Sequence, residues 1–469
     1  MIRKVTYFIL LIFLVNSCTF HNRKVEKEEV EQGLESIKEK GRITVLTDYS
    51  SIDYFIYRGQ PMGFQYEMLQ QLANHLSVRL EVRVSRSLNE SFNLLSTGEA
   101  DLIAQNLAIT KDRMELVDFT EPLVQSHQVL VQRKPENWRA MKSRSLDAFL
   151  ITNPVRLKDQ TIYVMRGSSA VSRLRNLSDE IGGDINVIEV DESPEQLFAL
   201  VSEGEIPFTV CDEVVAKVNA RYYPDVDIST AVSLQQELAW AVRKGSSSLL
   251  DELNDWISGF VQSPKYKNIY AKYFESSKSA YMVESDFYAI NTGRISPYDD
   301  YLKQYSEKLG WDWRLMASLV YQESRFKNNL TSWAGAWGLM QLMPATAKRF
   351  GVDTVSSPRE QIRAGSEFIV WLEKLFKDIP DREERTKFVL AAYNVGPGHI
   401  IDARNLAKKN GADHNVWDNN VARFLLSKSD PRFYNDPVVR FGYCRGTETF
   451  KYVSEVMERF EHYKNIVEK

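Results

Sequence analysis

The sequence lacks the features that define several common classes of protein. It has only three cysteines in 469 residues, and neither a C-x-x-C nor an H-E-x-x-H spacing occurs. A disulfide framework, a zinc site and thioredoxin-like chemistry are therefore disfavoured. Cys211 and Cys444 are predicted to be buried thiols rather than a bridge. With a formal net charge of −4, the chain also lacks the basic excess that holds nucleic acid, so we expect no nucleic-acid partner.

Glycine and proline are also scarce. The 22 glycines and 15 prolines exclude a collagen-like or low-complexity chain. The 43% of hydrophobic and 26% of charged residues are those of a packed globular protein. A single hydrophobic core stops growing at about 250–300 residues, so a chain of this length predicts two domains.

The longest apolar run near the start of the chain is too short to span a bilayer. Arg3 and Lys4 precede this run over residues 5–15, a pattern typical of a secretory signal peptide. The run ends at Asn16-Ser17-Cys18, which resembles the lipobox of bacterial lipoproteins. In such proteins, signal cleavage leaves a lipid-modified cysteine as the new N-terminus.

We therefore predict a signal peptide over residues 1–17, a lipid on Cys18 and a charged, lipid-anchored tether over residues 18–40, of which the stretch from residue 21 is alternatively an exposed first helix. An ordinary signal peptide with a chance cysteine is the alternative. Because Thr19 is not an acidic retention signal, the predicted location is the periplasmic side of the cell outer membrane.

Strand-like and helix-like patterns alternate between residues 41 and 275. Strand patterns occur at residues 43–46, 80–84, 101–104, 161–164 and 208–212. Helical patterns lie between them, as in residues 65–76 and in a helix closed by Gly98. This alternation predicts an α/β domain with a largely parallel sheet.

The order and spacing of these segments resemble the family-3 periplasmic solute-binding proteins of the amino-acid-binding type, whose two α/β lobes enclose a cleft. The best-matching stretches are residues 63–64, 98–102, 109–113, 117–122 and 211–216. The resemblance implies that Arg113 grips the α-carboxylate of a ligand and that Asp212 takes its α-ammonium. It also implies that Ser169 lies at the carboxylate and that Tyr49 or Tyr54 supplies an aromatic wall.

Taken singly, these residues have plainer interpretations. Arg113 is equally a surface arginine on a first helical turn, and Asp212 is equally a helix N-cap. Their occurrence together within one fold pattern favours ligand binding. Ala108 stands where the family commonly has a hydroxyl, which favours a small peptide or cell-wall fragment over a plain amino acid. Both an amino acid and a muropeptide stay open as the effector.

The composition changes over residues 276–296, where serines, asparagine and glycine predict a linker. Residues 297–469 then have helical patterns and few strand signals. Within this second domain, four residues fall on one face of a helix that Asp312 is suited to cap, namely Met316, Leu319, Val320 and Glu323.

A carboxyl group on an apolar face loses solvation in its charged form, which raises its pKa and keeps it protonated near neutral pH. Glu323 therefore suits the role of a general acid. The alternative is a frayed helix end with its glutamate turned to water.

Three separated motifs include or follow Glu323, at residues 323–326, 332–347 and 391–398. They resemble the E-S, G-L-M-Q and A-Y-N-x-G motifs of the soluble-type lytic transglycosylases, which have a mainly α, lysozyme-like fold. Residues 442–446 and Tyr452 match a late motif, with Tyr452 predicted to open a helix.

The resemblance implies that Glu323 is the catalytic residue. It also implies that five residues line the substrate site, namely Ser332, Gln341, Tyr393, Asn394 and Tyr452. For Trp333 and Trp337, core packing is the default and stacking on sugar faces is the alternative.

The two resemblances in this order, behind a lipoprotein signal, identify the chain as a member of the membrane-bound lytic murein transglycosylase F family. Membership implies a lyase that cleaves the bond between N-acetylmuramic acid and N-acetylglucosamine in peptidoglycan glycan strands. The products end in 1,6-anhydro-N-acetylmuramic acid, and no metal or organic cofactor is implied. A ligand of the first domain is expected to modulate the enzyme, and the alternative is that this domain only localises the enzyme near its substrate. Two alternatives remain, a hydrolytic muramidase on the same fold and a solute receptor whose helical domain only binds cell wall.

Overall fold

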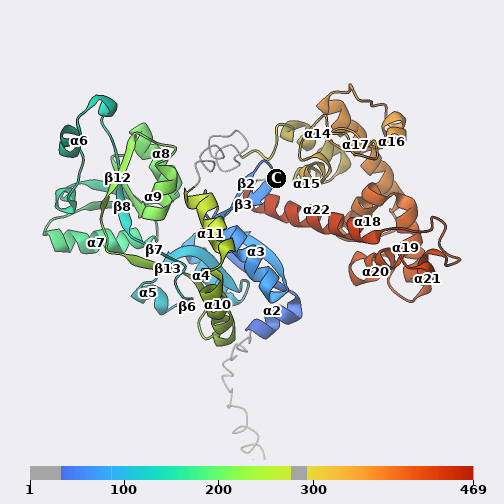
Figure 1. Cartoon of the computed structure of the whole chain (residues 1–469), viewed down its shortest axis with the longest axis horizontal. Helices are drawn as coiled ribbons and strands as arrows, with labels where there is room; N and C mark the ends of the chain where they lie inside the picture. Colours follow the sequence, from blue (N-terminus) through green and yellow to red (C-terminus); the bar gives the residue numbers. More distant parts are fainter. Residues whose placement is uncertain (1–32, 86, 276–292, 468–469) are drawn as a thin grey trace, which may run out of the picture.

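The computed structural model describes residues 33–85, 87–275 and 293–467, which form two α/β lobes and a helical domain. Lobe 1 lies between lobe 2 and the helical domain (Figure 1). The predicted signal peptide, Cys18 and most of the predicted linker lie outside the described residues. Among the helices of the described residues, none is both long and apolar enough to cross a membrane.

Lobe 1 is built on a mixed sheet of strand order β4-β1-β5-β13-β6, with β7 also paired to β13. Its strands are β1 (Arg42–Thr47), β4 (Arg79–Val84), β5 (Leu102–Ala108), β6 (Val117–Phe119), β7 (Val124–Ser126) and β13 (Gln236–Arg243). Its helices are α2 (Leu34–Lys40), α3 (Phe64–Leu76), α4 (Leu88–Thr97), α5 (Lys111–Met114), α10 (Ser247–Phe260), α11 (Pro264–Tyr270) and the π-helical turn η3 (Ala271–Glu275). A hairpin of β2 (Phe55–Tyr57) and β3 (Gln60–Met62) reaches toward the helical domain (Figure 1).

Lobe 2 has a second sheet, of strand order β10-β9-β11-β8-β12. Its strands are β8 (Gln128–Arg133), β9 (Thr161–Met165), β10 (Asn186–Val190), β11 (Phe208–Asp212) and β12 (Val226–Ala231). Its helices are η1 (Trp138–Ala140), α6 (Ser143–Phe149), η2 (Pro154–Leu157), α7 (Ser169–Ile181), α8 (Pro194–Glu203) and α9 (Glu213–Asn219).

The α/β class is confirmed, but both sheets are mixed rather than largely parallel. Strands β4, β1 and β5 are parallel in lobe 1, as are β10, β9 and β11 in lobe 2. Strands β8 and β13 are antiparallel to their partners because each enters its lobe directly after the chain crosses from the other lobe. A period-two pattern of apolar residues predicts a strand, but it does not predict whether the neighbouring strand is parallel or antiparallel.

The C-terminal domain is helical, as predicted. Its helices are α14 (Asp299–Leu309), α15 (Trp313–Ser324), α16 (Pro344–Arg349), α17 (Pro358–Leu375), α18 (Arg382–Val395), α19 (Pro397–Lys409), η4 (Trp417–Val421), α20 (Ala422–Ser427), α21 (Pro431–Tyr434) and α22 (Gly446–Ile466). Phe376, Phe388 and Trp417 are buried at its centre. Cys211 in lobe 2 and Cys444 in this domain are free and buried, as predicted.

Helix α22 begins earlier than expected. Tyr452, predicted to open a helix, lies one turn and a half inside it, because the helix starts at Gly446. A Cβ atom at position 446 would lie 2.3 Å from the carbonyl oxygen of Leu425. Only glycine fits this approach, so Gly446 of the late motif makes a packing contact at the helix start.

The folded domains extend into the predicted tether and linker. Leu34 and Ile37 of α2 are buried in the core of lobe 1, so residues 34–40 belong to that lobe. Ile295 is fully buried in the core of the helical domain, which therefore begins before residue 297. Single apolar residues in a polar stretch give no periodic pattern, so these boundaries were invisible in the sequence.

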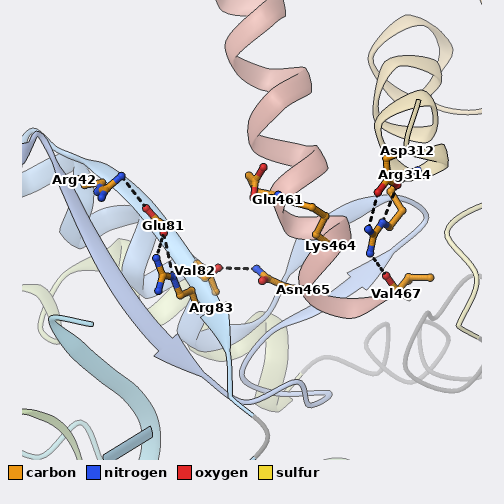
Figure 2. A network of polar contacts seen from close by, with 10 residues as sticks. All are labelled: Arg42, Glu81, Val82, Arg83, Asp312, Arg314, Glu461, Lys464, Asn465 and Val467. Atoms are coloured by element: carbon orange, nitrogen blue, oxygen red, sulfur yellow. Dashed lines mark hydrogen bonds and ion pairs between the residues drawn. The ribbon is translucent and has the colours of Figure 1, made fainter. Parts of the chain in front are cut away.

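The end of α22 packs against lobe 1. The Tyr54 hydroxyl lies 2.7 Å from Nδ1 of His462, and the Tyr66 hydroxyl lies 3.3 Å from Nε2 of the same ring. The Tyr463 hydroxyl donates to the carbonyl oxygen of Gly59 over 2.6 Å. Figure 2 shows the Asn465 amide donating to the backbone of β4. Lobe 1 and the helical domain therefore share a buried, hydrogen-bonded contact.

The turn of the β2–β3 hairpin lies against the end of α15. Gly59, at φ 77°, has a backbone conformation that favours glycine. A Cβ atom there would lie 2.6 Å from the Phe326 ring and 2.8 Å from the Tyr321 ring. These two aromatic residues flank Glu323 in the sequence. Contact with lobe 1 thus reaches the chain on either side of the predicted catalytic residue.

Candidate functional site

Glu323 lies in the last turn of α15, on the face predicted from the sequence. The Asp312 side chain caps this helix by accepting from the Arg314 N–H over 3.0 Å. Met316 and Leu319 on the same face are fully buried. Burial raises the pKa of Glu323 to about 7, although a hydrogen bond from the Tyr452 hydroxyl acts in the opposite direction. A carboxyl group with this pKa exchanges its proton near neutral pH.

Tyr452 and Tyr393 flank this carboxyl group. Tyr452 projects from α22 and donates its hydroxyl proton to Glu323. Tyr393, near the end of α18, donates to the carbonyl oxygen of Met340 over 2.6 Å. Burial, and next the charge of Glu323, raise the pKa of both tyrosines well above the usual value. Both phenols therefore stay protonated and act as hydrogen-bond donors beside Glu323.

Gln341 is held in a tight loop just after Met340. Its amide Nε2 donates to the carbonyl oxygens of Gly338 and Leu330 over 2.8 and 2.9 Å. Gln361 of α17 stabilises this loop, because its Oε1 atom accepts a hydrogen bond from the Leu339 N–H over 2.7 Å. Sequence reasoning missed Gln361, because it lies outside the three motifs and its only signal is a polar residue within a helical apolar pattern.

The remaining predicted substrate residues are held by local hydrogen bonds. Ser332 Oγ accepts from the Ala336 N–H over 2.9 Å, and Asn394 Oδ1 accepts from Thr449 of α22 over 2.8 Å. Trp333 is 100% exposed, so the default of core packing was wrong for this residue. An indole with no packing partner in the described residues is available to a ligand.

The second candidate site lies where the two lobes meet. Arg113 of α5 donates to the carbonyl oxygen of Ala108 over 3.0 Å and reaches Gly167 of lobe 2 at 3.4 Å. Asp212 lies opposite Arg113 in lobe 2, at the end of β11. Burial lowers the pKa of Arg113, and the negative charge of Asp212 counteracts this effect. Burial raises the pKa of Asp212 to about 6. The structure thus brings together two charges that lie 99 positions apart in the sequence numbering.

Asp212 is not used as a helix cap. It occupies the N-cap position of α9, but its side chain accepts no hydrogen bond from that helix. Its Oδ1 atom is buried and has no partner within the described part of the chain. Ser169 starts α7, where its hydroxyl accepts from Gln128 over 2.8 Å. An unpaired buried carboxylate oxygen is costly, which favours a ligand role over the capping alternative.

Tyr49 and Tyr54, one of which was predicted to supply an aromatic wall for the ligand, lie in different surroundings. Tyr54 is fully buried with its hydroxyl on His462, so its polar end belongs to the contact with α22 and not to the cleft. Tyr49 is half-buried, and its hydroxyl has no partner among the described residues. Sequence spacing alone does not distinguish them, because the chain turns between residues 49 and 54.

Three acidic residues of the cleft were not predicted, namely Asp48, Asp53 and Glu195. Burial raises the pKa of each one above its usual value. Glu195 follows a serine and a proline at the start of α8, where acidic residues are common, so its sequence context is that of an ordinary first helical turn. Asp48 and Asp53 lie in a short polar segment that resembles a surface loop.

Known proteins match both halves of the chain. Residues 42–276 match the family model of bacterial extracellular solute-binding proteins, family 3, and residues 300–416 match the transglycosylase SLT domain. A protein of Desulfosudis oleivorans named membrane-bound lytic murein transglycosylase F is 32% identical over 432 residues, or 92% of this chain and 91% of that protein. The chain belongs to this family.

A second family member, from Photobacterium profundum, is 31% identical over 458 residues, or 96% of this chain and 84% of that protein. Among solved structures, an ancestral arginine-binding protein bound to arginine is 24% identical, with a TM-score of 0.43. That match covers 50% of this chain and 98% of the other. Family membership agrees with the predicted order of a solute-binding domain followed by a helical transglycosylase domain.

Proposed function

We propose that the chain is a peptidoglycan lytic transglycosylase, a lyase in which Glu323 serves first as general acid and then as general base. One observation carries the proposal. Glu323 lies half-buried at the end of α15 with a pKa of about 7 and a hydrogen bond from Tyr452. A residue that both gives and takes a proton in one turnover works best with a pKa near ambient pH.

The proposed reaction proceeds in two steps. Glu323 protonates the oxygen that joins N-acetylmuramic acid to N-acetylglucosamine, and the acetamido group of the substrate stabilises the cation that develops at C1. The ionised Glu323 then takes the proton of the muramyl 6-hydroxyl, whose oxygen bonds to C1. The product is a 1,6-anhydro ring, the carboxyl group regains its proton, and no water is consumed.

The surroundings of Glu323 suit this use of a single carboxyl group. Glycosidases that hydrolyse with their own side chains need a second carboxylate as nucleophile or base. In the part of the chain that the structure describes, the hydrogen bond to Glu323 comes from Tyr452, and no second carboxylate is bonded or ion-paired to it. Tyr452 and Tyr393 supply neutral donors for sugar hydroxyl and acetamido groups.

Digestion of purified sacculi tests the reaction type. The soluble fraction is analysed by mass spectrometry, which separates anhydro ends from reducing ends by the mass of one water. We expect anhydro ends. Reducing ends instead would establish a hydrolytic muramidase, and binding to sacculi without soluble products would establish a solute receptor with a cell-wall-binding domain.

We also propose that the cleft of the first domain binds an amino acid or a muropeptide that modulates lysis. Arg113 would hold a carboxylate, and the unpaired Asp212 an ammonium group, one from each lobe. The segment from Tyr49 to Asp53 lies at the cleft and continues into the β2–β3 hairpin, whose Gly59 contacts the aromatic residues on either side of Glu323. A change in lobe closure therefore has a packed route to the catalytic residue.

The proposed location is the periplasmic side of the outer membrane, with the chain attached through a lipid on Cys18. The support is the sequence from Arg3 to Thr19, together with the name of the family, which describes its members as membrane-bound. A substrate in the cell wall agrees with this place.

A further inference from the structure

A fully buried ion pair in the helical domain holds the chain just before α22. Lys428, at the end of α20, and Asp402 of α19 are each 0% exposed, and Nζ of the lysine lies 2.8 Å from Oδ2 of the aspartate. Asp402 also accepts from the Arg440 and Phe441 N–H groups, each over 2.8 Å, and the Cys444 N–H donates to the carbonyl oxygen of Lys428 over 3.2 Å. A buried ion pair often adds no net stability, because both groups lose their hydration. What this pair does in the structure is to fix the backbone of residues 440–444.

Two aromatic side chains project from this fixed segment. Phe441 and Tyr443, called here the aromatic pair, are 58% and 57% exposed. Each ring meets a second ring edge-on, with the centroid of Phe441 6.2 Å from that of His399 and the centroid of Tyr443 5.9 Å from that of Tyr434. The pair is therefore held in place, while more than half of each side chain is open to solvent. Exposed apolar groups gathered in this way are typical of a binding surface.

The aromatic pair adjoins residues predicted to bind the substrate. A Cβ atom at Gly398 would lie 2.6 Å from the Phe441 ring, so this ring lies directly on the glycine. Gly398 closes the motif at residues 391–398, which also contains Asn394. Asn394 in turn accepts from Thr449 at the start of α22, the helix that follows the aromatic pair in the chain. The aromatic pair is therefore continuous with the predicted substrate site.

The chemistry of the aromatic pair suits a sugar. A pyranose ring has a face of C–H groups, which packs on an aromatic ring while the sugar hydroxyls stay in water. The proposed substrate is a polymer of such sugars, and its scissile bond is placed precisely only when the sugars beyond that bond are also held. Rings that are fixed before binding lose little conformational freedom when a sugar stacks on them. Continuity with the substrate residues makes the sugars of a glycan strand the occupant that this position favours.

We propose that Phe441 and Tyr443 form a stacking surface for sugars of the glycan strand beyond the bond that is cleaved. The buried pair of Asp402 and Lys428 positions this surface. The inference rests on the proposed function of the helical domain as a transglycosylase, and it adds a contact with the polymer at a place that transfers no proton. The aromatic pair thus contributes to the affinity for glycan strands and not to the rate of the chemical step.

Kinetics of fragment release from purified sacculi test this surface in the full-length protein in detergent. The double substitution Phe441→Ala/Tyr443→Ala should raise the apparent KM about tenfold, because two aromatic contacts are lost. It should leave kcat within about twofold, because the lost contacts are the same in the ground state and the transition state. Phe441→Tyr/Tyr443→Phe keeps both rings and should keep the KM of the unchanged protein. The matched control is Phe149→Ala, which removes a 59% exposed ring from lobe 2.

Binding measured without turnover gives a second readout. In the Glu323→Gln protein, co-sedimentation with sacculi reports affinity alone. Adding Phe441→Ala/Tyr443→Ala should weaken this binding about tenfold, and adding Phe149→Ala should leave it unchanged. Thermal unfolding of each variant checks that the helical domain is folded.

Other outcomes separate the stacking surface from the proposed function. An unchanged KM together with unchanged co-sedimentation would show that the aromatic pair does not touch the glycan strand. A fall in kcat at constant KM, or a weak variant that keeps both rings, would show that the segment acts through the start of α22 and not by stacking. If the unchanged protein releases no fragments but loses binding to sacculi with the aromatic pair, the lytic function fails and the sugar-binding surface stands.

Discussion

At the scale of single residues, each of the two candidate sites contains a buried acid whose pKa is raised by burial. Glu323 keeps a proton near neutral pH because its surroundings are apolar and its hydrogen-bond partner is a neutral phenol. Asp212 is buried too, but Arg113 opposes the rise in its pKa. The proposed general acid and the proposed contact for an ammonium group are thus placed in different electrostatic surroundings.

Substitution of the catalytic carboxyl group is the first prediction. Glu323→Gln keeps the shape of the side chain but has no proton to deliver, so lytic activity should fall by about 10²–10⁴-fold. Release of soluble fragments from sacculi measures it. Glu461→Gln, at an exposed residue of α22, is the matched control. Retention of more than about a tenth of the activity in a folded Glu323→Gln protein would contradict the assignment.

The second prediction concerns the pKa of Glu323. The hydrogen bond from Tyr452 lowers this pKa, so Tyr452→Phe should raise it, by about one unit if the bond has the usual strength of one to a charged group. Because Glu323 then keeps its proton to a higher pH, the pH–rate profile should shift toward alkaline values. Tyr301→Phe, on the exposed face of α14, should leave the profile in place. A lower rate with an unshifted profile would show that Tyr452 acts on the substrate alone.

At the scale of elements, α22 connects the catalytic residue with lobe 1. Tyr452 at one part of the helix bonds to Glu323, and His462, ten residues later, lies between Tyr54 and Tyr66. A rise of 1.5 Å per residue separates these contacts by about 15 Å. Because a helix is stiff over this length, we expect a shift of lobe 1 at His462 to move Tyr452 as well.

The third prediction tests this contact through its pH dependence. Burial, and to a smaller extent Arg459, lower the pKa of His462 to about 3. In the unfolded chain a histidine takes a proton near pH 6.5, so the neutral buried ring stabilises the fold fully above pH 6.5 and progressively less as the pH falls toward 3. Between pH 7 and pH 5 the loss should be about 2 kcal/mol.

The comparison variant is His462→Gln, whose amide bonds to both tyrosines without titrating in this range. Thermal unfolding at pH 7 and pH 5 should show a larger loss of stability for the unchanged protein than for the variant. Since both proteins share every other acid, the difference reports His462. Equal losses would mean that the ring is already accessible to protons in the folded state.

At the scale of the whole molecule, the helical domain packs on lobe 1, where α22 contacts β2, β3 and β4 (Figure 1). Closure of lobe 2 onto lobe 1 is therefore the way in which a ligand held by both lobes would influence the enzyme. A ligand shifts this closure by no more than the difference between its affinities for the open and closed forms. A coupling of about 1–3 kcal/mol would change activity roughly 5- to 150-fold.

The fourth prediction follows from this arrangement. Arg113→Ala should abolish binding of an amino acid or muropeptide in calorimetry, because it removes the cation for the carboxylate. The ratio of lysis rates with and without ligand should then become one. Arg144→Ala, at an exposed position of lobe 2, is the matched control. If ligands bind the unchanged protein but never alter its rate, the domain serves to localise the enzyme rather than to regulate it.

The fifth prediction concerns attachment. Cys18→Ser removes the predicted lipid, and the protein should appear in the soluble periplasmic fraction, because the charged stretch that follows has no apolar face of its own. Immunoblotting of fractionated cells measures it. A variant that still sediments with membranes would place the anchor elsewhere.

The sequence by itself determined the two domain classes and the position of Glu323 on an apolar helix face. Each of these depends on periodicity or motif spacing within a short stretch, and a local pattern carries that information. Matching motifs also pointed to Tyr452 and Tyr393 before any contact was known. The direction of strands, the ends of the domains and the exposure of Trp333 had no local signal.

Only the tertiary structure decided which distant residues meet. Tyr452 reaches Glu323 across 129 positions, Ser51 reaches Glu195 across 144, and Tyr54 reaches His462 across 408. The last contact places the hydroxyl of Tyr54 against α22, and the second joins the two lobes. A hydrogen bond between remote segments depends on how whole elements pack and on where the chain crosses between lobes. The local sequence around the bonded residues contains no information on either.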